Sequence, residues 1–271
     1  MFNLYVVATP IGNLEDVSRR TLRVLAEVKL IAAEDTRKTR RLLNAYDIKT
    51  PMTSYYEHNK LTKLEYLLDC LEEADLALVS EAGTPGLSDP GYELIAAAIE
   101  RGVPVVSIPG PSAVTAALAV SGLPTDRFTF LGFLPRKTGD RKRSLETVLN
   151  ECATIVLLEA PHRLTAALGD ILFILGDRRI AVCRELTKIH EEVFRGTVCQ
   201  AVDYFTVPRG EFTLVIEGKP ESEKPQVTEE IENHLRQLRH SGVSAKDAVA
   251  GMAQETGLSK KELYQLWLKQ D

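Results

Sequence analysis

The feature that most constrains the fold is an alternation of short apolar runs with helix-like segments in the first 121 residues. Apolar runs at residues 4–8, 30–33, 76–80 and 103–108 predict buried strands. Residues 14–28, with apolar side chains at helical spacing, and the compact segments 92–100 and 112–121 predict helices. This alternation predicts a mostly parallel sheet with helices on both faces. Each run ends in a turn rich in Gly, Pro, Asn or Asp, at the strand ends where ligands bind in α/β sheets.

A change of pattern at "SGLPTDRF", residues 121–128, predicts a domain boundary. Four further strands are expected at residues 128–134, 154–158, 180–184 and 211–217, with helices at residues 140–151 and 161–175. The last run, "EFTLVIEG", alternates apolar and polar residues, which suits a mixed or antiparallel sheet. We therefore expect an N-terminal α/β domain over residues 1–122 and a second α/β domain over residues 123–220.

A polar segment with two prolines, residues 218–226, predicts a linker to a small helical extension over residues 227–271. Residues 229–239 predict one helix, and the rest of the tail predicts a helix, a turn with glycine and a second helix. Ser244 and Ser259 are expected as N-caps, and Gly257 as the residue that ends a helix. This outline is typical of a helix-turn-helix.

Composition excludes several classes of protein. The chain of 271 residues is 44% hydrophobic, which is enough for a sizeable core, and no apolar run approaches the roughly 20 residues of a membrane span. Its four cysteines are scattered and never form CxxC, so we expect a reduced cytoplasmic protein without a disulfide framework or zinc site. A net charge of −5 argues against coating nucleic acid by global charge, but it leaves room for local basic patches.

The most informative loop is "VSEAGTPGLSDPG", residues 79–91, which follows a predicted strand. Its glycines permit positive φ angles and close approach of a ligand to the main chain. Asp89 and Pro90 predict a helix start, as N-cap and first helical residue. The loop is neither GxxxxGK[ST] nor GxGxxG, so we expect a ligand that is held mainly by backbone groups. An ordinary βα turn is the alternative. "SIPGPSA", residues 107–113, ends the next strand in a similar way, and it leaves ligand binding and close helix packing equally open.

Charged residues gather in three places. "AEDTRKTRRLL", residues 33–43, and the cluster Arg136, Lys137, Arg141, Lys142 and Arg143 each suit either a solvated surface or a phosphate-binding rim. "EAPHR" and "RELTKIHEE" hold many titratable groups, which suit acid–base or orienting roles better than a metal site, since no HExxH or complete ligand set is present. A surface ion-pair network is the alternative for any one of these residues.

Eight motifs, in order, make the chain resemble a known family. They are "VATPIGNLEDVSRRTLRVL", "AEDTRKTRRLL", "VSEAGTPGLSDPG", "IPGPSA", "FLGFLPRK", "EAPHR", "RELTKIHEE" and "GEFTLVIEG". Together they resemble the bacterial ribosomal RNA small subunit methyltransferase I family of the tetrapyrrole methylase superfamily. Two positions depart from the expected pattern: Ala160 stands where the family motif has Ser, and Thr84 stands where tetrapyrrole enzymes carry Asp. A ligand contact at Thr84 would then use the backbone and the hydroxyl.

The resemblance implies two α/β domains with S-adenosylmethionine in a cleft between them, held largely by the backbone. It implies transfer of the methyl group to the ribose 2′-oxygen of a cytidine in the decoding region of 16S ribosomal RNA, and a homodimer. Metal is not expected. Carried over by motif, the cofactor contacts are Pro10, Gly83, Thr84, Leu87, Ser112, Ala113, Leu186, Gly210, Phe212 and Thr213.

The motifs also give candidates for catalysis and RNA binding. The candidates for orienting or deprotonating the ribose hydroxyl are Glu159, His162, Lys188 and Glu191, with Asn13, Asp35 and Arg37 facing them from the first domain. The alternative is that the protein supplies no base and solvent takes the proton. RNA contacts are assigned to Arg37, Arg40, Arg41, Arg136, Lys137 and Arg163, and to the helical tail. The alternatives are a methyltransferase for a tetrapyrrole precursor and a DNA-binding regulator whose α/β body senses a ligand.

Overall fold

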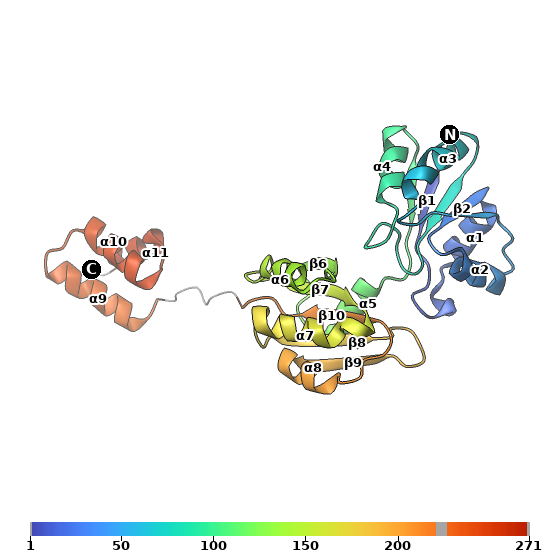
Figure 1. Ribbon diagram of the computed structural model, residues 1–271. Coiled ribbons are helices and arrows are strands. Elements are labelled where there is room, and N and C mark those ends of the chain that lie inside the picture. Colours follow the sequence, from blue (N-terminus) through green and yellow to red (C-terminus); the bar gives the residue numbers. More distant parts are fainter. Residues whose placement is uncertain (1, 221–226, 270–271) are drawn as a thin grey trace. The chain divides into compact units, whose positions relative to one another are not determined.

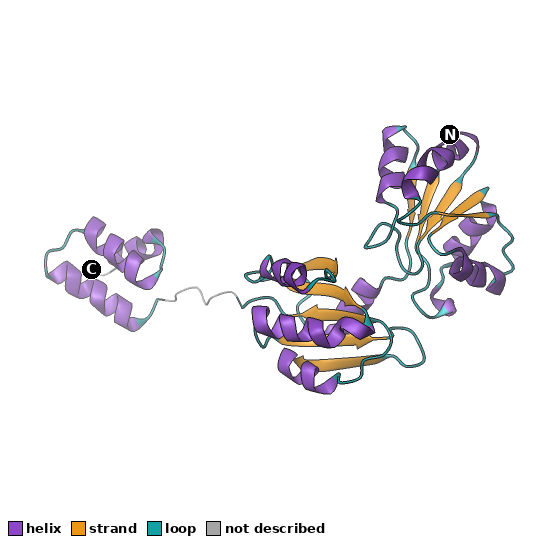
Figure 2. Cartoon of the chain, viewed as in Figure 1, coloured by secondary structure: helices purple, strands orange, loops and turns teal. Residues whose placement is uncertain are grey.

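The computed structural model describes residues 2–220 and 227–269. It divides into two compact units, Met1–Lys219 and Pro220–Asp271. The first unit contains two five-stranded sheets with their helices, and the described part of the second is helical (Figures 1 and 2). The linker predicted at residues 218–226 lies largely outside the described residues. None of the helices within the described ranges is long and apolar enough to cross a membrane.

The first sheet is entirely parallel, as the alternation of strands and helices predicts. Its strand order is β3-β2-β4-β1-β5, and each neighbouring pair runs in the same direction. Buried, near-continuous apolar strands of this kind require helices on both faces. The strands are β1 (Leu4–Val7), β2 (Leu30–Ala33), β3 (Met52–Ser54), β4 (Leu76–Val79) and β5 (Val105–Ile108).

Two pairs of helices cover this sheet on opposite faces (Figure 1). Helices α1 (Arg19–Glu27) and α2 (Thr36–Ala45) pack on one face, and α3 (Lys60–Glu73) and α4 (Tyr92–Glu100) pack on the other. The single helix expected at residues 14–28 is wrong. It is a short 3-10 turn, Leu14–Asp16, followed by α1, because Ser18 is extended and caps the backbone N–H of Thr21.

The second sheet is mixed, with strand order β6-β7-β10-β8-β9. Strands β6 and β7 are parallel, whereas the other neighbouring pairs are antiparallel, as the alternation in "EFTLVIEG" predicts for β10. The helices of the main core cluster cover one face. The elements are β6 (Phe128–Phe133), α6 (Thr138–Glu146), β7 (Thr154–Glu159), α7 (Pro161–Leu175), β8 (Arg179–Arg184), β9 (Glu192–Thr197), α8 (Val198–Tyr204) and β10 (Phe212–Ile216).

Helix α5 (Ala113–Ser121) links the two sheets. It follows β5 of the first sheet in the chain, but its buried Ala117 and Leu118 pack against Val156, Ala181 and Val215 of the second sheet. The chain therefore crosses between the sheets within "IPGPSA", just before α5. The boundary predicted at residue 122 places this helix with the first half, whereas its packing places it with the second.

The second unit is a three-helix bundle with its own core, made of α9 (Glu229–His240), α10 (Ala245–Thr256) and α11 (Lys260–Leu268). Ser244 and Ser259 cap α10 and α11, and Gly257 ends α10 in the left-handed region at φ 71°. These three local predictions are confirmed. Ser259 and Glu262 form a complete capping box, which satisfies two backbone N–H groups at the start of α11.

We predict that Ser259→Ala destabilises this bundle by about 1 kcal/mol, because the backbone donors at the start of α11 lose their acceptor. Trp267, the one tryptophan of the chain, lies buried in this core, so its fluorescence during urea unfolding reports on the bundle alone. The exposed Lys261→Ala on the same helix serves as control, with a change of a few tenths of a kcal/mol. Equal effects of the two substitutions would contradict the capping role.

Candidate functional site

Two loops meet at the carboxyl edge of the first sheet. Thr9, which follows β1, and Gly83, which follows β4, exchange two backbone hydrogen bonds of 2.9 and 3.0 Å. The glycine loop, residues 79–91, then turns through positive φ angles at Gly83, Gly86 and Gly91 (78°, 82° and 152°). Ser88 also takes a positive φ of 66°, which is uncommon for a residue with a side chain. These angles confirm that the glycines permit backbone conformations closed to other residues.

The predicted helix start at Asp89 and Pro90 is wrong. Helix α4 begins at Tyr92, its N-cap is Gly91, and no side chain caps it. Asp89 lies two residues before the N-cap, and its carboxyl group makes no capping hydrogen bond. Asp89 instead lines a cavity beneath the loop, so a residue that looked architectural belongs to the candidate site.

The glycine-loop cavity has a volume of about 630 Å³, within the usual range for small-molecule sites. The loop forms one wall, and the start of α5 and strands β6, β7 and β10 form the others. Its sides include the aromatic rings of Phe130, Phe133 and Phe212. Ser112 is the N-cap of α5, but its hydroxyl makes no capping hydrogen bond and so stays available to the cavity.

The polar lining of this cavity is acidic. Five carboxylic acids reach it, and among the described residues that line it none is Lys or Arg. The cavity therefore favours a ligand that carries positive charge and a flat apolar part that can stack on aromatic rings. The acids are Glu34, Glu81, Asp89, Glu159 and Glu211.

Asp89 has the most perturbed carboxyl group of this set. Burial, followed by the nearby charge of Glu34, raises its pKa to about 7, although a hydrogen bond from Ser80 opposes the rise. Burial also raises the pKa of Glu34, against the backbone N–H of Glu81 that donates to its Oε2 at 2.9 Å. Such crowding of acids in a poorly solvated cavity is typical of a site that awaits a cationic ligand.

Glu159 lies at the end of β7 and is only 1% exposed. Its Oε1 accepts the backbone N–H of Ala160 at 2.9 Å and lies 3.2 Å from Nε of Arg163. Its Oε2 has no hydrogen-bond partner within the described residues. Burial raises the pKa of Glu159, although Ala160 N–H and Arg163 oppose this. An unsatisfied buried carboxyl oxygen costs free energy, so a ligand group that donates to it would be favoured.

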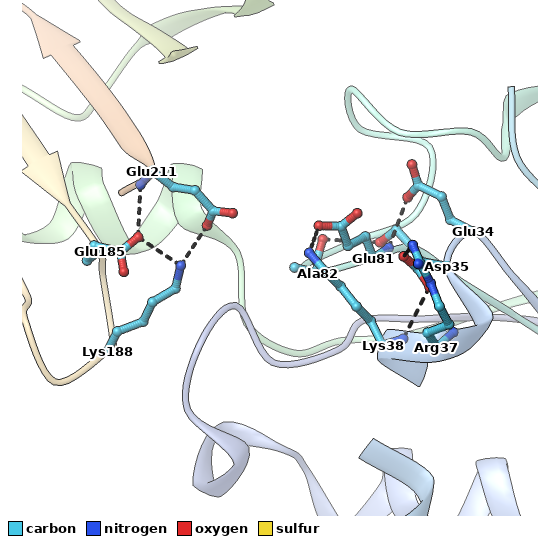
Figure 3. Close-up of polar contacts among 10 residues, drawn as sticks. Glu34, Asp35, Arg37, Lys38, Glu81, Ala82, Glu185, Lys188 and Glu211 are labelled. Carbon is cyan, nitrogen blue, oxygen red and sulfur yellow. Dashed lines mark hydrogen bonds and ion pairs between the residues drawn. The ribbon is translucent and has the colours of Figure 1, made fainter. Parts of the chain in front are cut away.

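A lysine and two carboxylates form a second polar group, between β8, the turn after it and the start of β10 (Figure 3). Lys188 Nζ bonds Glu185 Oε1 and Glu211 Oε2, each at 2.9 Å. Burial lowers the pKa of Lys188, but the hydrogen bonds to Glu211 and Glu185 outweigh it, and the pKa is raised. Lys188 therefore stays protonated at neutral pH and acts as a cation, not as a base.

A smaller cavity of about 330 Å³, the α2 cavity, adjoins the first. It lies between the loop after β1, helix α2 and the Lys188 side chain. Both cavities are bordered by Ile11, Glu81, Ala82 and Glu211. Figure 3 shows its polar lining residues, with Lys188 and Glu211 in one group and Lys38 and Glu81 in the other.

The structure brings together part of the predicted site. Seven of the residues predicted from the sequence to contact the cofactor line the glycine-loop cavity, as do two of the residues predicted to be catalytic. Pro10 and Lys188 line the α2 cavity, Leu186 is buried in the core, and Gly210 packs against Glu185. The nine residues are Gly83, Thr84, Leu87, Ser112, Ala113, Phe212, Thr213, Glu159 and His162.

Three predicted members lie elsewhere and have local partners. Glu191 is exposed in the turn before β9, where its Oε2 accepts the backbone N–H of Thr187. Asn13 caps the 3-10 turn through the N–H of Glu15, and Asp35 caps α2. A hydrogen bond from Arg37 lowers the pKa of Asp35. These contacts give Asn13, Asp35 and Glu191 structural roles in the loops around the site.

Some of the basic residues are exposed, and others are paired within the protein. Arg37, Arg40, Arg41, Arg136 and Lys137 are exposed. In contrast, Arg141 is buried against Asp170 at 2.6 Å. Arg163, whose side chain is 14% exposed, donates to the carbonyl groups of Leu134 and Pro135. Since its guanidinium faces the protein, Arg163 fits a role in positioning Glu159 better than the predicted RNA contact.

Three residues that line the glycine-loop cavity were not predicted from the sequence motifs. Glu34 and Glu81 sit in motifs whose charges suit ion pairs, and Glu211 precedes a strand in an ordinary way. The one available clue was position, because Glu34 and Glu81 directly follow predicted strands and Glu211 is the first residue of one. Metal binding gains no support, since among the described residues no group of three or more His, Cys, Asp or Glu side chains is placed to hold an ion.

Comparison with known proteins identifies the family. The model of the Tetrapyrrole (Corrin/Porphyrin) Methylases matches residues 3–202, and that of the RsmI C-terminal HTH domain matches residues 225–271. A relative from Halalkalibacterium halodurans named "Ribosomal RNA small subunit methyltransferase I" is 46% identical over 97% of this chain and 94% of its own. The chain belongs to the ribosomal RNA small subunit methyltransferase I family. The resemblance drawn from the eight motifs is therefore confirmed.

A second relative with the same name, from Synechocystis, is 48% identical over 98% of this chain and 97% of its own. Solved structures of tetrapyrrole methylases and other enzymes share the fold of the first unit. The methyltransferase CobJ matches with a TM-score of 0.62 over 84% of this chain and 97% of its own, at 16% identity. Diphthine synthase matches with a TM-score of 0.60 over 80% and 90%, at 14% identity.

We predict that Asp89→Asn stabilises the first unit at pH 8 and not at pH 4. The folded-state pKa of about 7 lies above the unfolded value of 3.8, so the wild type loses stability as the pH rises from about 4 through 7. Asparagine stays neutral and avoids this loss. Urea unfolding followed by circular dichroism at both pH values measures it. The exposed Asp203→Asn is the control, and an equal pH dependence in both variants would contradict a buried, neutral Asp89.

Proposed function

We propose that the protein methylates small-subunit ribosomal RNA with S-adenosylmethionine, at the ribose 2′-oxygen of a cytidine in the decoding region of 16S RNA. The observation that carries this proposal is the acidic, aromatic glycine-loop cavity in a chain of the ribosomal RNA small subunit methyltransferase I family. The name of the relatives supports RNA as substrate, and the cavity supports the cofactor.

The lining of the glycine-loop cavity fits S-adenosylmethionine. This cofactor supplies a methyl group that is activated on a positively charged sulfonium. Its sulfonium and ammonium charges suit the five carboxylic acids, and its adenine ring suits Phe130, Phe133 and Phe212. The backbone of the glycine loop, opened by Gly83 and Gly86, can approach the ligand closely. Thr84 lines the cavity, so the predicted contact through its backbone and hydroxyl remains part of the proposal.

The protein must also orient a ribose hydroxyl and receive its proton. Positioning accounts for much of the barrier reduction when the methyl donor is already activated. Glu159 and Glu211 border the glycine-loop cavity, and Lys188 holds Glu211 in place. His162 lines the same cavity and is exposed. We assign Glu159 to the cationic cofactor, because its buried Oε2 has no hydrogen-bond partner among the described residues and it borders the glycine-loop cavity. Proton acceptance falls to Glu211, His162 or solvent.

We predict that Glu159→Gln weakens S-adenosylmethionine binding roughly 10-fold or more, because a hydrogen bond to a charged group is typically worth about 1.5–3 kcal/mol. Isothermal titration calorimetry measures the affinity. Glu100→Gln makes the same chemical change on the exposed end of α4 and serves as the matched control. Unchanged affinity in Glu159→Gln would remove this residue from the cofactor site.

The direct test of the proposed reaction is mass spectrometry of ribose-methylated nucleosides in ribosomal RNA. RNA from cells with the protein should contain a 2′-O-methylated cytidine of the small subunit that is missing from cells without it. A methylated base in place of a methylated ribose would overturn the proposed acceptor atom. No difference between the two RNA samples would overturn RNA as substrate.

A methyltransferase for a tetrapyrrole precursor is the second candidate, favoured by the fold shared with uroporphyrin-III C-methyltransferase from Thermus thermophilus. The names of relatives that are 46% and 48% identical favour ribosomal RNA over a tetrapyrrole as the acceptor. A labelled-methyl transfer assay with small ribosomal subunits and uroporphyrinogen III as rival acceptors separates the two. We also propose a homodimer from the family resemblance, and a cytoplasmic location from the scattered cysteines. From the sequence pattern we propose domains over residues 1–122, 123–220 and 227–271.

A further inference from the structure

The α2 cavity, unlike the larger glycine-loop cavity, is bordered by lysine and arginine side chains within the described residues. Three cations border it, Lys38, Arg41 and Lys188, and none of these borders the glycine-loop cavity. The two carboxylates of the α2 cavity, Glu81 and Glu211, are the ones shared by both cavities. Acceptors of hydrogen bonds therefore lie where the cavities meet, and cations lie only in the smaller one.

Lysines hold both shared carboxylates. Lys38 Nζ pairs with Glu81, and Lys188 Nζ pairs with Glu211 at 2.9 Å (Figure 3). Ionised carboxylates accept hydrogen bonds only, so they suit hydroxyl groups. Arg41, by contrast, is exposed at the cavity and provides a planar donor fork of the kind that binds phosphate.

Helix geometry divides the basic residues of α2 into two stripes. Lys38 and Arg41 are three residues apart, so they lie on one face of the helix, and both line the cavity. Arg37 and Arg40 have the same spacing on the neighbouring face, and neither is among the lining residues. The cluster predicted from the sequence as one RNA-binding rim is therefore two surfaces, of which only one serves the cavity.

A buried hydroxyl group also points to a ligand. Thr9 lines the α2 cavity and is 4% exposed, and its Oγ1 has no hydrogen-bond partner within the described residues. A buried hydroxyl without a partner is unfavourable unless a ligand or water satisfies it. The lining of the cavity thus includes a hydroxyl group without a partner, in addition to the carboxylates at the junction and the cations.

We propose that the α2 cavity receives a single ribonucleotide of the RNA substrate, with its ribose 2′-hydroxyl at the junction formed by Glu81 and Glu211 and its phosphate at Arg41 and Lys38. The proposal rests on the proposed function, because a methyltransferase that acts on RNA needs a nucleotide site that opens into the cofactor cavity. About 330 Å³ holds one nucleotide and not a helix, so the target nucleotide must leave its base stack.

The test compares Arg41→Gln with Arg40→Gln in the full chain. The two arginines are neighbours on α2 and both are exposed, but only Arg41 lines the cavity. The probes are cytidine 5′-monophosphate, followed by NMR titration, and S-adenosylmethionine, followed by calorimetry. Arg41→Gln should weaken monophosphate binding about 10-fold, because a charge-assisted contact to phosphate is lost, and leave cofactor affinity unchanged. Arg40→Gln should leave monophosphate affinity within twofold of wild type, and Arg41→Lys should retain part of it.

A second probe tests the orientation of the nucleotide. The 2′-deoxy monophosphate should bind more weakly than cytidine 5′-monophosphate, because the carboxylates at the junction lose a hydroxyl partner. Equal effects of Arg40→Gln and Arg41→Gln, or no effect of either, would overturn the proposal. So would a wild-type protein that binds no monophosphate at millimolar concentration. If the wild type does not bind S-adenosylmethionine, the proposed function is overturned. The monophosphate titration would still show whether the α2 cavity binds a nucleotide.

Discussion

Two backbone hydrogen bonds between Thr9 and Gly83 hold the candidate site together. Strands β1 and β4 are parallel neighbours, so the loops that follow them leave the same edge of the sheet side by side. The bridge between these loops fixes the glycine loop over one cavity and the loop after β1 beside the other. Because Gly83 takes a φ of 78°, a residue with a side chain would strain the bridge that joins both cavities.

The two cavities differ in the charges that line them. Carboxylic acids concentrate beneath the glycine loop, where burial and mutual repulsion raise the pKa values of Asp89 and Glu34. Cations gather only beside α2, and lysines pair with the two acids at the junction. Such an arrangement suits a cationic methyl donor on one side and an anionic acceptor on the other, since each cavity repels the other's ligand.

Much of the fold follows from patterns within the sequence. Buried apolar strands and the caps at Ser244, Ser259 and Gly257 were predictable, since a strand or cap depends on a few adjacent residues. Strands β3 and β9 and helix α8 lack comparably clear patterns. Helix α3 was not predicted, although its Leu64, Leu68 and Leu71 have helical spacing. Gly83, Thr84 and Ser112 of the site were predictable because glycine-rich turns and helix starts at strand ends bind ligands. Asp89 was not, because its dipeptide with Pro90 is typical of a helix start, whereas α4 begins only at Tyr92 with Gly91 as its N-cap.

The sequence by itself determined the fold class, the position of the glycine loop and the family, because these depend on periodicity and on motifs within short segments. Tertiary structure alone decided which charges share a space. Glu34, Asp89 and Glu211 come from distant parts of the chain, and Arg41 differs from Arg40 only in the helix face that it occupies. Burial and the distance between charges set pKa values and binding, and both are created when the sheets and helices pack.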